Sequence, residues 1–190
     1  IEITSLLLDN GASAGDPNLI QSAVSKSNMS MTTLLINNGA PVNSPKLIQT
    51  AVDNSSLEIT KTLIASGASP ADPKLIKSAV GNKNLEISKL LLENGAPAGE
   101  KELIKTAVNN QSKGIVKELL NYGADPDAGM QSAVDKNYAD ISLMLLGAGA
   151  DAKNPKLIKS AAANGNLTIT TALVERGAAP DDGVLGSING

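Results

Sequence analysis

The chain has 190 residues, a formal net charge of −3 and 42% hydrophobic residues, and it contains no Cys, His, Trp or Phe. Without Cys and His there are no disulfides, no thiolate nucleophiles, no ligands of the commonest transition-metal sites and no histidine general base. The aromatic residues are Tyr122 and Tyr138, and Arg176 is the one arginine among sixteen basic residues, which disfavours nucleic-acid binding. No apolar run is long enough to span a bilayer, so we expect no transmembrane segment.

A Gly-Ala pair recurs along the chain at spacings of 28, 28, 28, 28, 26 and 28 residues. Its positions are Gly11, Gly39, Gly67, Gly95, Gly123, Gly149 and Gly177. A fixed period of this length is typical of repeat architectures, in which each repeat is one supersecondary unit. We therefore expect residues 1–190 to form a single repeat domain. It would hold a partial unit over 1–15, units starting near 16, 44, 72, 100, 127 and 154, and a tail over 178–190.

The best-formed unit, residues 72–96, opens with a helix that has a clear start and one apolar face. Asp72 can accept a backbone N–H of the first turn, and Pro73 suits the first helical position because its missing N–H is not needed there. The apolar stripe at helical period comprises Leu75, Ile76, Ala79 and Val80. Other units repeat the same start as Asp16-Pro17, Ser44-Pro45 and Asn154-Pro155. The recurrence of a capping residue before proline predicts a first helix in each unit.

A tight turn over residues 81–84, with the sequence Gly-Asn-Lys-Asn, leads into a second helix. We expect its Gly and Asn to supply the left-handed backbone that tight turns need. The second helix carries Ile87, Leu91 and Leu92 on one face, and Gly95 ends it as a left-handed C-cap.

Helices of about ten residues are marginal alone in water, so the apolar face of each must be covered by a neighbouring unit. Stacking achieves this and gives one continuous core. The linkers between Gly-Ala and the next helix start are short, as over 69–71, which leaves little or no room for strands. The predicted fold class is therefore all-α: an elongated α-solenoid of stacked helix-turn-helix repeats.

The second half of each unit resembles the ankyrin repeat family. Residues 85–96 read L-E-I-S-K-L-L-L-E-N-G-A, which is similar to the family pattern G-x-L-E-V-V-x-L-L-L-x-x-G-A-D, and Asp125 and Asp151 supply its final Asp in their units. The first half departs, because D-P-K-L-I stands where that family has T-P-L-H, and the period is 28 instead of 33. The resemblance implies a protein-binding solenoid whose first helices line the concave side. The shortened linkers imply that the projecting β-hairpins are missing.

The two ends of the chain show incomplete units. Ile1 aligns with residues inside the second helix of later units, and residues 181–190 resemble the start of a further unit that stops at Gly186 and Gly190. Solenoids normally carry polar capping repeats, and neither end has an obvious one. The chain is then a piece of a longer array, or one capped by residues outside this sequence, or it has an apolar end that contacts a partner or another copy.

Lysines recur on the polar side of the first helices. They are Lys46, Lys74, Lys77, Lys105, Lys156 and Lys159, and Asn18, Gln21 and Gln131 continue the stripe as amides. Such a row could be a solvated helix face. Alternatively, it could be a partner-binding groove that steers an acidic protein surface. We take these lysines as candidate binding residues.

The short unit between Gly123 and Gly149 is another candidate. Met130 replaces the usual Leu-Ile pair, and Tyr122 and Tyr138 border the unit. Tyr and Met are common interface residues, so both tyrosines join the candidate binding residues. The alternative is a local deletion with ordinary repacking.

These patterns predict a protein-protein interaction module or scaffold that binds another protein through its helical face. The alternative is a structural subunit packed permanently in a large assembly through its ends and edges. No phosphate loop, nucleophile elbow or metal cluster is present in the sequence. We therefore expect no enzymatic activity, no cofactor and no nucleic-acid partner.

Overall fold

The computed structural model describes residues 1–189, which form fourteen α-helices and no strand. Seven of them lie before residue 98: α1 (Glu2–Asp9), α2 (Pro17–Ser25), α3 (Met29–Asn37), α4 (Pro45–Asp53), α5 (Leu57–Ala65), α6 (Pro73–Gly81) and α7 (Leu85–Glu93). The other seven are α8 (Lys101–Asn109), α9 (Lys113–Asn121), α10 (Asp127–Asp135), α11 (Ala139–Gly147), α12 (Pro155–Ala163), α13 (Leu167–Glu175) and α14 (Pro180–Asn189). None of the described helices is both long enough and apolar enough to cross a membrane.

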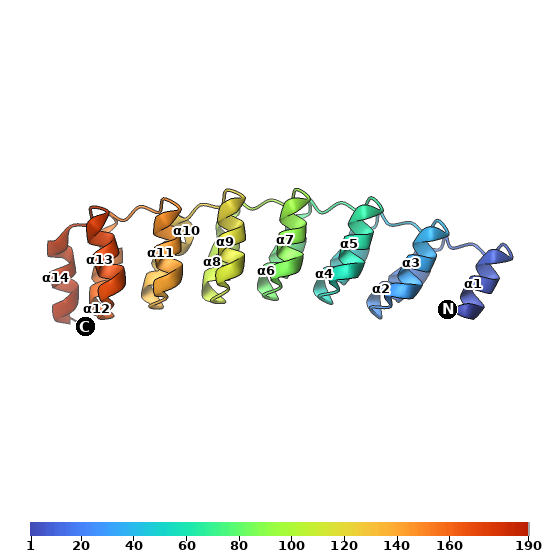
Figure 1. Cartoon of the computed structure of the whole chain (residues 1–190), viewed down its shortest axis with the longest axis horizontal. Helices are drawn as coiled ribbons and strands as arrows, with labels where there is room; N and C mark the ends of the chain where they lie inside the picture. The colour runs from blue at the N-terminus through green and yellow to red at the C-terminus, as the bar shows by residue number, and fades with distance from the viewer. Residues whose placement is uncertain (190) are drawn as a thin grey trace. The chain divides into compact units, whose positions relative to one another are not determined.

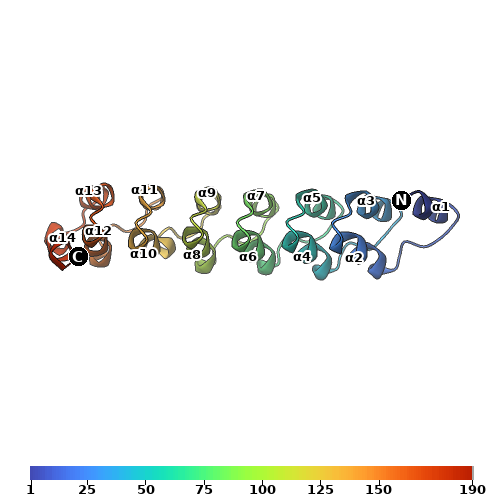
Figure 2. The same ribbon diagram turned by 90° about the horizontal axis from the view of Figure 1, so that it is seen from below.

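The helices divide into two compact modules, an N-terminal module over Ile1–Pro97 and a C-terminal module over Ala98–Gly190. In the N-terminal module the first helices α2, α4 and α6 form one layer, and α1, α3, α5 and α7 form the other (Figures 1 and 2). In the C-terminal module the layers are α8, α10, α12 and α14, and α9, α11 and α13 (Figure 2). Each first helix from α2 to α12 packs on its own second helix and on the first helix of a neighbouring repeat within its module. The prediction of stacked helix-turn-helix repeats is confirmed.

Capping residues begin the first helices largely as expected. Asp72 Oδ1 accepts the backbone N–H of Lys74 at 2.9 Å, and Asp16 and Asn154 form the equivalent bond in their repeats. Ser44 is the exception, because its side chain makes no capping hydrogen bond although it precedes α4. Proline occupies the first turn after all four of these residues. The helix starts are thus set by local chemistry.

The predicted apolar stripes form the core. In the repeat that starts at α6, Leu75 and Ile76 are fully buried, and so are Ile87 and Leu91 on α7. Burial of one such side chain contributes about 1.5–3 kcal/mol. Ala79 is also fully buried, and its small side chain lets the neighbouring helix approach closely. The helices of each repeat are therefore stabilised mainly by the contacts between them.

The turn between the two helices uses the left-handed backbone at a different residue from the one predicted. In the 81–84 turn, Lys83 has φ +58°, whereas Asn82 has φ −77° and Gly81 still belongs to α6. The same position is Ser27, Ser55, Gln111, Asn137 and Gly165 in the other turns. The expectation for Gly81 and Asn82 was wrong because composition identifies a turn but not the residue that reverses the chain. The prediction for Gly95 is confirmed by its φ of +90° and by the bond from Ala96 N to Leu91 O at 2.9 Å.

The two-residue deletion in the short repeat falls in a linker. Residues 122–126 join α9 to α10, whereas seven residues, 38–44, join α3 to α4. Gly129 occupies the position of the usual Leu, and a β-carbon there would lie 3.0 Å from Val108 Cγ2. Met130 is buried in the core. The short repeat has therefore repacked around a glycine, and Met130 presents no exposed surface.

The C-terminal segment forms a complete helix, contrary to the expected stop at Gly186. Helix α14 runs to Asn189, and the other expected stop, Gly190, lies outside the described residues. Gly183 and Gly186 both face α12, where a β-carbon on Gly186 would overlap the backbone of Lys159. Asp182 also pairs with Lys159 Nζ at 3.0 Å. Gly186 thus allows close helix packing and does not break the helix.

The left-handed turn position gives a test of local backbone strain. Because Gly165 has φ +65° and open space around it, Gly165→Ala should lower the free energy of unfolding by about 1 kcal/mol. Gln111→Gly should raise it by about 0.5 kcal/mol, since relief of strain exceeds the extra entropy of glycine. Urea unfolding of each variant measures both changes. Gly147→Ala, at a helical glycine with open space, serves as the control and should not destabilise. Equal changes in unfolding free energy for Gly165→Ala and Gly147→Ala would contradict the interpretation that position 165 needs a left-handed backbone.

The contact of α14 with α12 gives a second test. Gly186→Ala should force the two helices apart and cost about 1–3 kcal/mol, as overpacking does. The expected signature is faster amide hydrogen exchange over residues 180–189 than in the parent chain. Ser187→Ala changes an exposed neighbour on the same helix and should leave exchange unchanged. Undiminished protection in Gly186→Ala would show that α14 does not pack through this glycine.

Candidate functional site

The six candidate lysines all lie on first helices, but they do not form one continuous row. In the N-terminal module Lys46 on α4 lies on the helix next to the one that carries Lys74 and Lys77, α6. In the C-terminal module Lys105 is on α8, while Lys156 and Lys159 are on α12. Helix α10 lies between those two helices, and it carries Ala128 and Gln131 at the corresponding positions. The structure therefore brings lysines together on adjacent helices only in the N-terminal module.

Ion pairs offset part of the predicted positive charge. Lys105 Nζ lies 2.9 Å from Glu102 Oε1, and Lys159 Nζ lies 3.0 Å from Asp182 Oδ1. Exposed pairs of this kind stabilise a fold by less than about 1 kcal/mol, but they reduce the local positive potential. Lys46, Lys74 and Lys156 are exposed and form no ion pair with any residue from 1 to 189. We therefore centre the candidate site on Lys46 and Lys74.

The glutamines of the predicted stripe hold neighbouring repeats together. Gln21 Nε2 donates to Thr50 Oγ1 on the next first helix at 3.0 Å, and Gln131 Nε2 lies 3.4 Å from Ser160 Oγ. These side chains are partly buried between helices, so they are not positioned as partner-binding groups. The sequence analysis did not predict this role. The signal that could have indicated it is the hydroxyl residue on the first helix of the next repeat, Thr50 or Ser160, to which each glutamine donates.

Other polar bonds join the first helices in the same way. Ser78 Oγ donates to Asp53 Oδ1 at 2.5 Å in the N-terminal module, and Ser132 Oγ donates to Asn109 Oδ1 at 2.7 Å in the C-terminal module. Asp53 also accepts from Gln49 Nε2 at 2.7 Å. Much of the polar surface beside the lysines is thus committed to contacts between repeats.

The two tyrosines lie at opposite edges of the C-terminal module. Tyr122 directly follows α9, whereas Tyr138 directly precedes α11. Because α9 and α11 are neighbouring second helices in one layer, the end of one and the start of the other lie at opposite edges. Tyr122 is exposed and Tyr138 is half-buried. The structure therefore does not bring Tyr122 and Tyr138 together.

The edge beside Tyr138 also carries an ion pair. Lys113 Nζ on α9 donates to Asp140 Oδ2 on α11 at 2.8 Å. The hydrogen bond from Lys113, followed by its charge, lowers the pKa of the Asp140 carboxyl below its usual range. Asp140 is therefore charged at neutral pH, and it offsets the lysine there.

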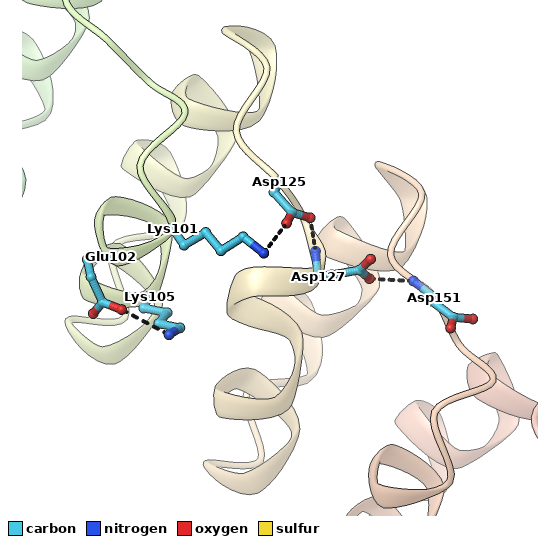
Figure 3. Close-up of polar contacts among 6 residues, drawn as sticks. All are labelled: Lys101, Glu102, Lys105, Asp125, Asp127 and Asp151. Atoms are coloured by element: carbon cyan, nitrogen blue, oxygen red, sulfur yellow. Dashed lines mark hydrogen bonds and ion pairs between the residues drawn. The ribbon is translucent and has the colours of Figure 1, made fainter.

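Three aspartates organise the linkers of the C-terminal module. Asp125 accepts the backbone N–H of Asp127 at 3.0 Å and pairs with Lys101 at 3.4 Å, and Asp127 accepts the backbone N–H of Asp151 at 2.6 Å (Figure 3). Asp125 and Asp151 directly follow Gly-Ala, so the sequence marks their positions in the repeat. It does not indicate which hydrogen bonds and ion pairs they form. No group of acidic side chains among residues 1–189 is arranged to hold a metal ion. These carboxylates shape the linkers.

Both ends of the chain expose apolar side chains. At the start, Ile3 and Leu7 on α1 are exposed, and at the other end Val184 and Ile188 on α14 are exposed. Each of these apolar faces is a further candidate surface, distinct from the lysine-bearing face.

Comparison with known proteins identifies the fold. No family model and no curated protein sequence matches the chain. The human ASB11 ankyrin repeat domain superposes with a TM-score of 0.66 at 19% identity, covering 84% of each chain. The ankyrin repeat domain of Bcl-3, a member of the IkappaB protein family, superposes with a TM-score of 0.68 at 22% identity. That alignment covers 87% of this chain and 88% of Bcl-3.

The linker aspartates give a test of the site's framework. Asp127→Ala should cost about 1 kcal/mol of unfolding free energy, because the Asp151 N–H loses its acceptor. Asp127→Asn keeps an acceptor oxygen and should retain most of that stability. Chemical denaturation of both variants makes the comparison. If both variants lose the same stability, the negative charge at the start of α10 is the stabilising feature and not the bond.

Proposed function

We propose that this chain, which has the fold of an ankyrin-repeat solenoid, is a protein-interaction module. In this proposal a partner with an acidic surface lies against the exposed side of the first helices. The single observation that carries the proposal is the exposed pair Lys46 and Lys74 on the adjacent helices α4 and α6.

The absence of strands among residues 1–189 supports this choice of surface. Without β-hairpin fingers, the helices themselves are what the repeats can present to a partner. The apolar stripes of α4 and α6 are buried, so the solvent-facing side of these helices is polar, as with Lys74 beside the buried Leu75 and Ile76. A polar, positively charged face of this kind contributes more to association rate and specificity than to affinity.

The N-terminal module is the stronger candidate for this role. In the C-terminal module Lys105 and Lys159 are paired with acidic residues, and α10 contributes no lysine to the row. In the N-terminal module Lys46 and Lys74 have no such pairing among the described residues. Long-range attraction of an acidic partner therefore favours the α4–α6 surface.

The partner can be captured and the surface tested in one series. A photo-crosslinking amino acid at Lys77 on α6 should capture the partner in an extract of the native source. The same group at Lys61, on the second helix α5, should capture much less. The captured protein should then associate about tenfold more slowly with the Lys46→Glu/Lys74→Glu variant at low salt, and its rate should depend less on ionic strength.

The control for this experiment is the Lys61→Glu/Lys89→Glu variant. It makes the same charge change in the same module but on the second helices α5 and α7. Association measured by stopped flow should match the parent chain for this control. Equal rates for the parent chain and the Lys46→Glu/Lys74→Glu variant would rule out the lysine surface.

A structural subunit of a larger assembly is the second candidate. The observation that favours it is the exposure of apolar side chains at both ends, such as Ile3 and Ile188. A module should be found alone and bind its partner reversibly. A structural subunit should be recovered from its source only in a large complex.

A further inference from the structure

The first helices of the N-terminal module present one exposed polar side chain at the same position in successive repeats. This position directly follows the proline that begins each helix, and it is Asn18 on α2, Lys46 on α4 and Lys74 on α6. Helix α4 packs on both α2 and α6. Because the axes of packed helices lie about 8–10 Å apart, we expect about the same distance between Lys46 and Lys74.

Shallow depressions flank the start of α4 on both sides. The depression towards α2 has a volume of about 280 Å³, and among the described residues that line it Lys46 alone is charged, beside Pro17, Pro41 and Asn43. The depression towards α6 has a volume of about 170 Å³, and Asp72 and Asn43 are in its lining. An α-helix with its side chains is about 10–12 Å wide, so it would lie across these depressions, whereas the side chains of an extended segment can enter them.

The lysine spacing selects among the conformations of a bound segment. Polyproline II has three residues per turn and rises about 3.1 Å per residue, so side chains at i and i+3 face the same way about 9 Å apart. In a β-strand, side chains on one face are about 6.6 Å or about 13 Å apart. In an α-helix, residues i and i+7 share a face about 10.5 Å apart. Polyproline II and the α-helix both fit the spacing, and of these two only polyproline II also fits the depressions.

The charges on this surface favour an acidic segment with a particular pattern. Lys46 and Lys74 pair with no acidic residue among residues 1–189, so each can pair with a carboxylate of a partner. Asp72 lines the depression between α4 and α6, where its charge would repel an acidic side chain. Acidic residues are therefore favoured beside the two lysines and disfavoured between them.

We propose that the acidic element of the partner is a segment in the polyproline II conformation, with carboxylates at residues i and i+3 that pair with Lys46 and Lys74. One of the two residues between them enters the depression that Asp72 lines, and it is uncharged. The residue before the first carboxylate reaches the depression between α2 and α4. This inference rests on the proposed function and specifies the chemistry of the partner.

Selection from a displayed library of short random peptides measures the preferred spacing directly. The targets are the parent 190-residue chain, the Lys46→Glu/Lys74→Glu variant and the Lys61→Glu/Lys89→Glu variant, which makes the same charge change on α5 and α7. Peptides enriched on the parent chain should carry Asp or Glu three residues apart, with proline enriched beside them because it favours polyproline II. The same peptides should be enriched on Lys61→Glu/Lys89→Glu and reduced at least tenfold on Lys46→Glu/Lys74→Glu.

Synthetic peptides of one composition then isolate the spacing and the depressions. They carry two acidic residues placed two, three or seven residues apart, and fluorescence polarisation at low salt measures their binding. The three-residue spacing should bind about tenfold more tightly than either of the others. Asn43→Trp, which fills both depressions and leaves the lysines in place, should weaken this binding about tenfold. Asn37→Trp, at an exposed asparagine on α3, is its control and should bind as the parent chain does.

The outcomes separate this inference from the proposed function. Enrichment of acidic residues two or seven apart, or unchanged binding by Asn43→Trp, would overturn the polyproline II segment and leave the lysine surface intact. No acidic enrichment on the parent chain would also overturn it, because the acidic groups of the partner would then belong to a folded surface. Equal enrichment of acidic peptides on the parent chain and on Lys46→Glu/Lys74→Glu would overturn both the segment and the lysine surface.

Discussion

The short length of the helices governs the structure. Each described helix has eight to ten residues, which is too short for a stable helix in water, so its apolar stripe must be covered by other helices. Ile87 and Leu91 on α7 are fully buried for this reason, as are Leu75 and Ile76 on α6. The helices are therefore stabilised mainly by contacts between repeats, and a repeat without a neighbour leaves part of its apolar surface exposed.

The same constraint decides what the polar residues do. Neighbouring repeats must satisfy backbone groups at their shared edges, and asparagines in the turns meet this need. Asn54 Nδ2 donates to the carbonyls of Val24 and Ser25, and Asn164 Nδ2 donates to that of Val134. With Gln21, these residues are bound into the stack. The polar residues left for a partner are those that stay exposed and unpaired with a neighbouring helix, such as Lys46 and Lys74.

The features that the sequence predicted are those set within one helix or one turn. The Asp72 cap, the Leu75 stripe and the Gly95 stop each depend on residues a few positions apart, and the structure confirms all three. The features it missed depend on other repeats or on the exact turn geometry. Gly186 reads as a helix stop in the sequence, but in the structure it packs on the backbone of Lys159. Lys159 in turn reads as an available cation, but it pairs with Asp182 on α14.

The two kinds of candidate binding surface differ in whether the apolar stripes of the short helices are covered there. From α4 to α12 the apolar stripes are buried or nearly so. The exposed side of the first helices in this range is therefore left to polar and charged contacts such as those of Lys46 and Lys74. At α1 and α14 the stripes remain exposed, so those surfaces favour apolar contacts. The two surfaces lie on different residues, and a contact at the ends leaves the lysines accessible.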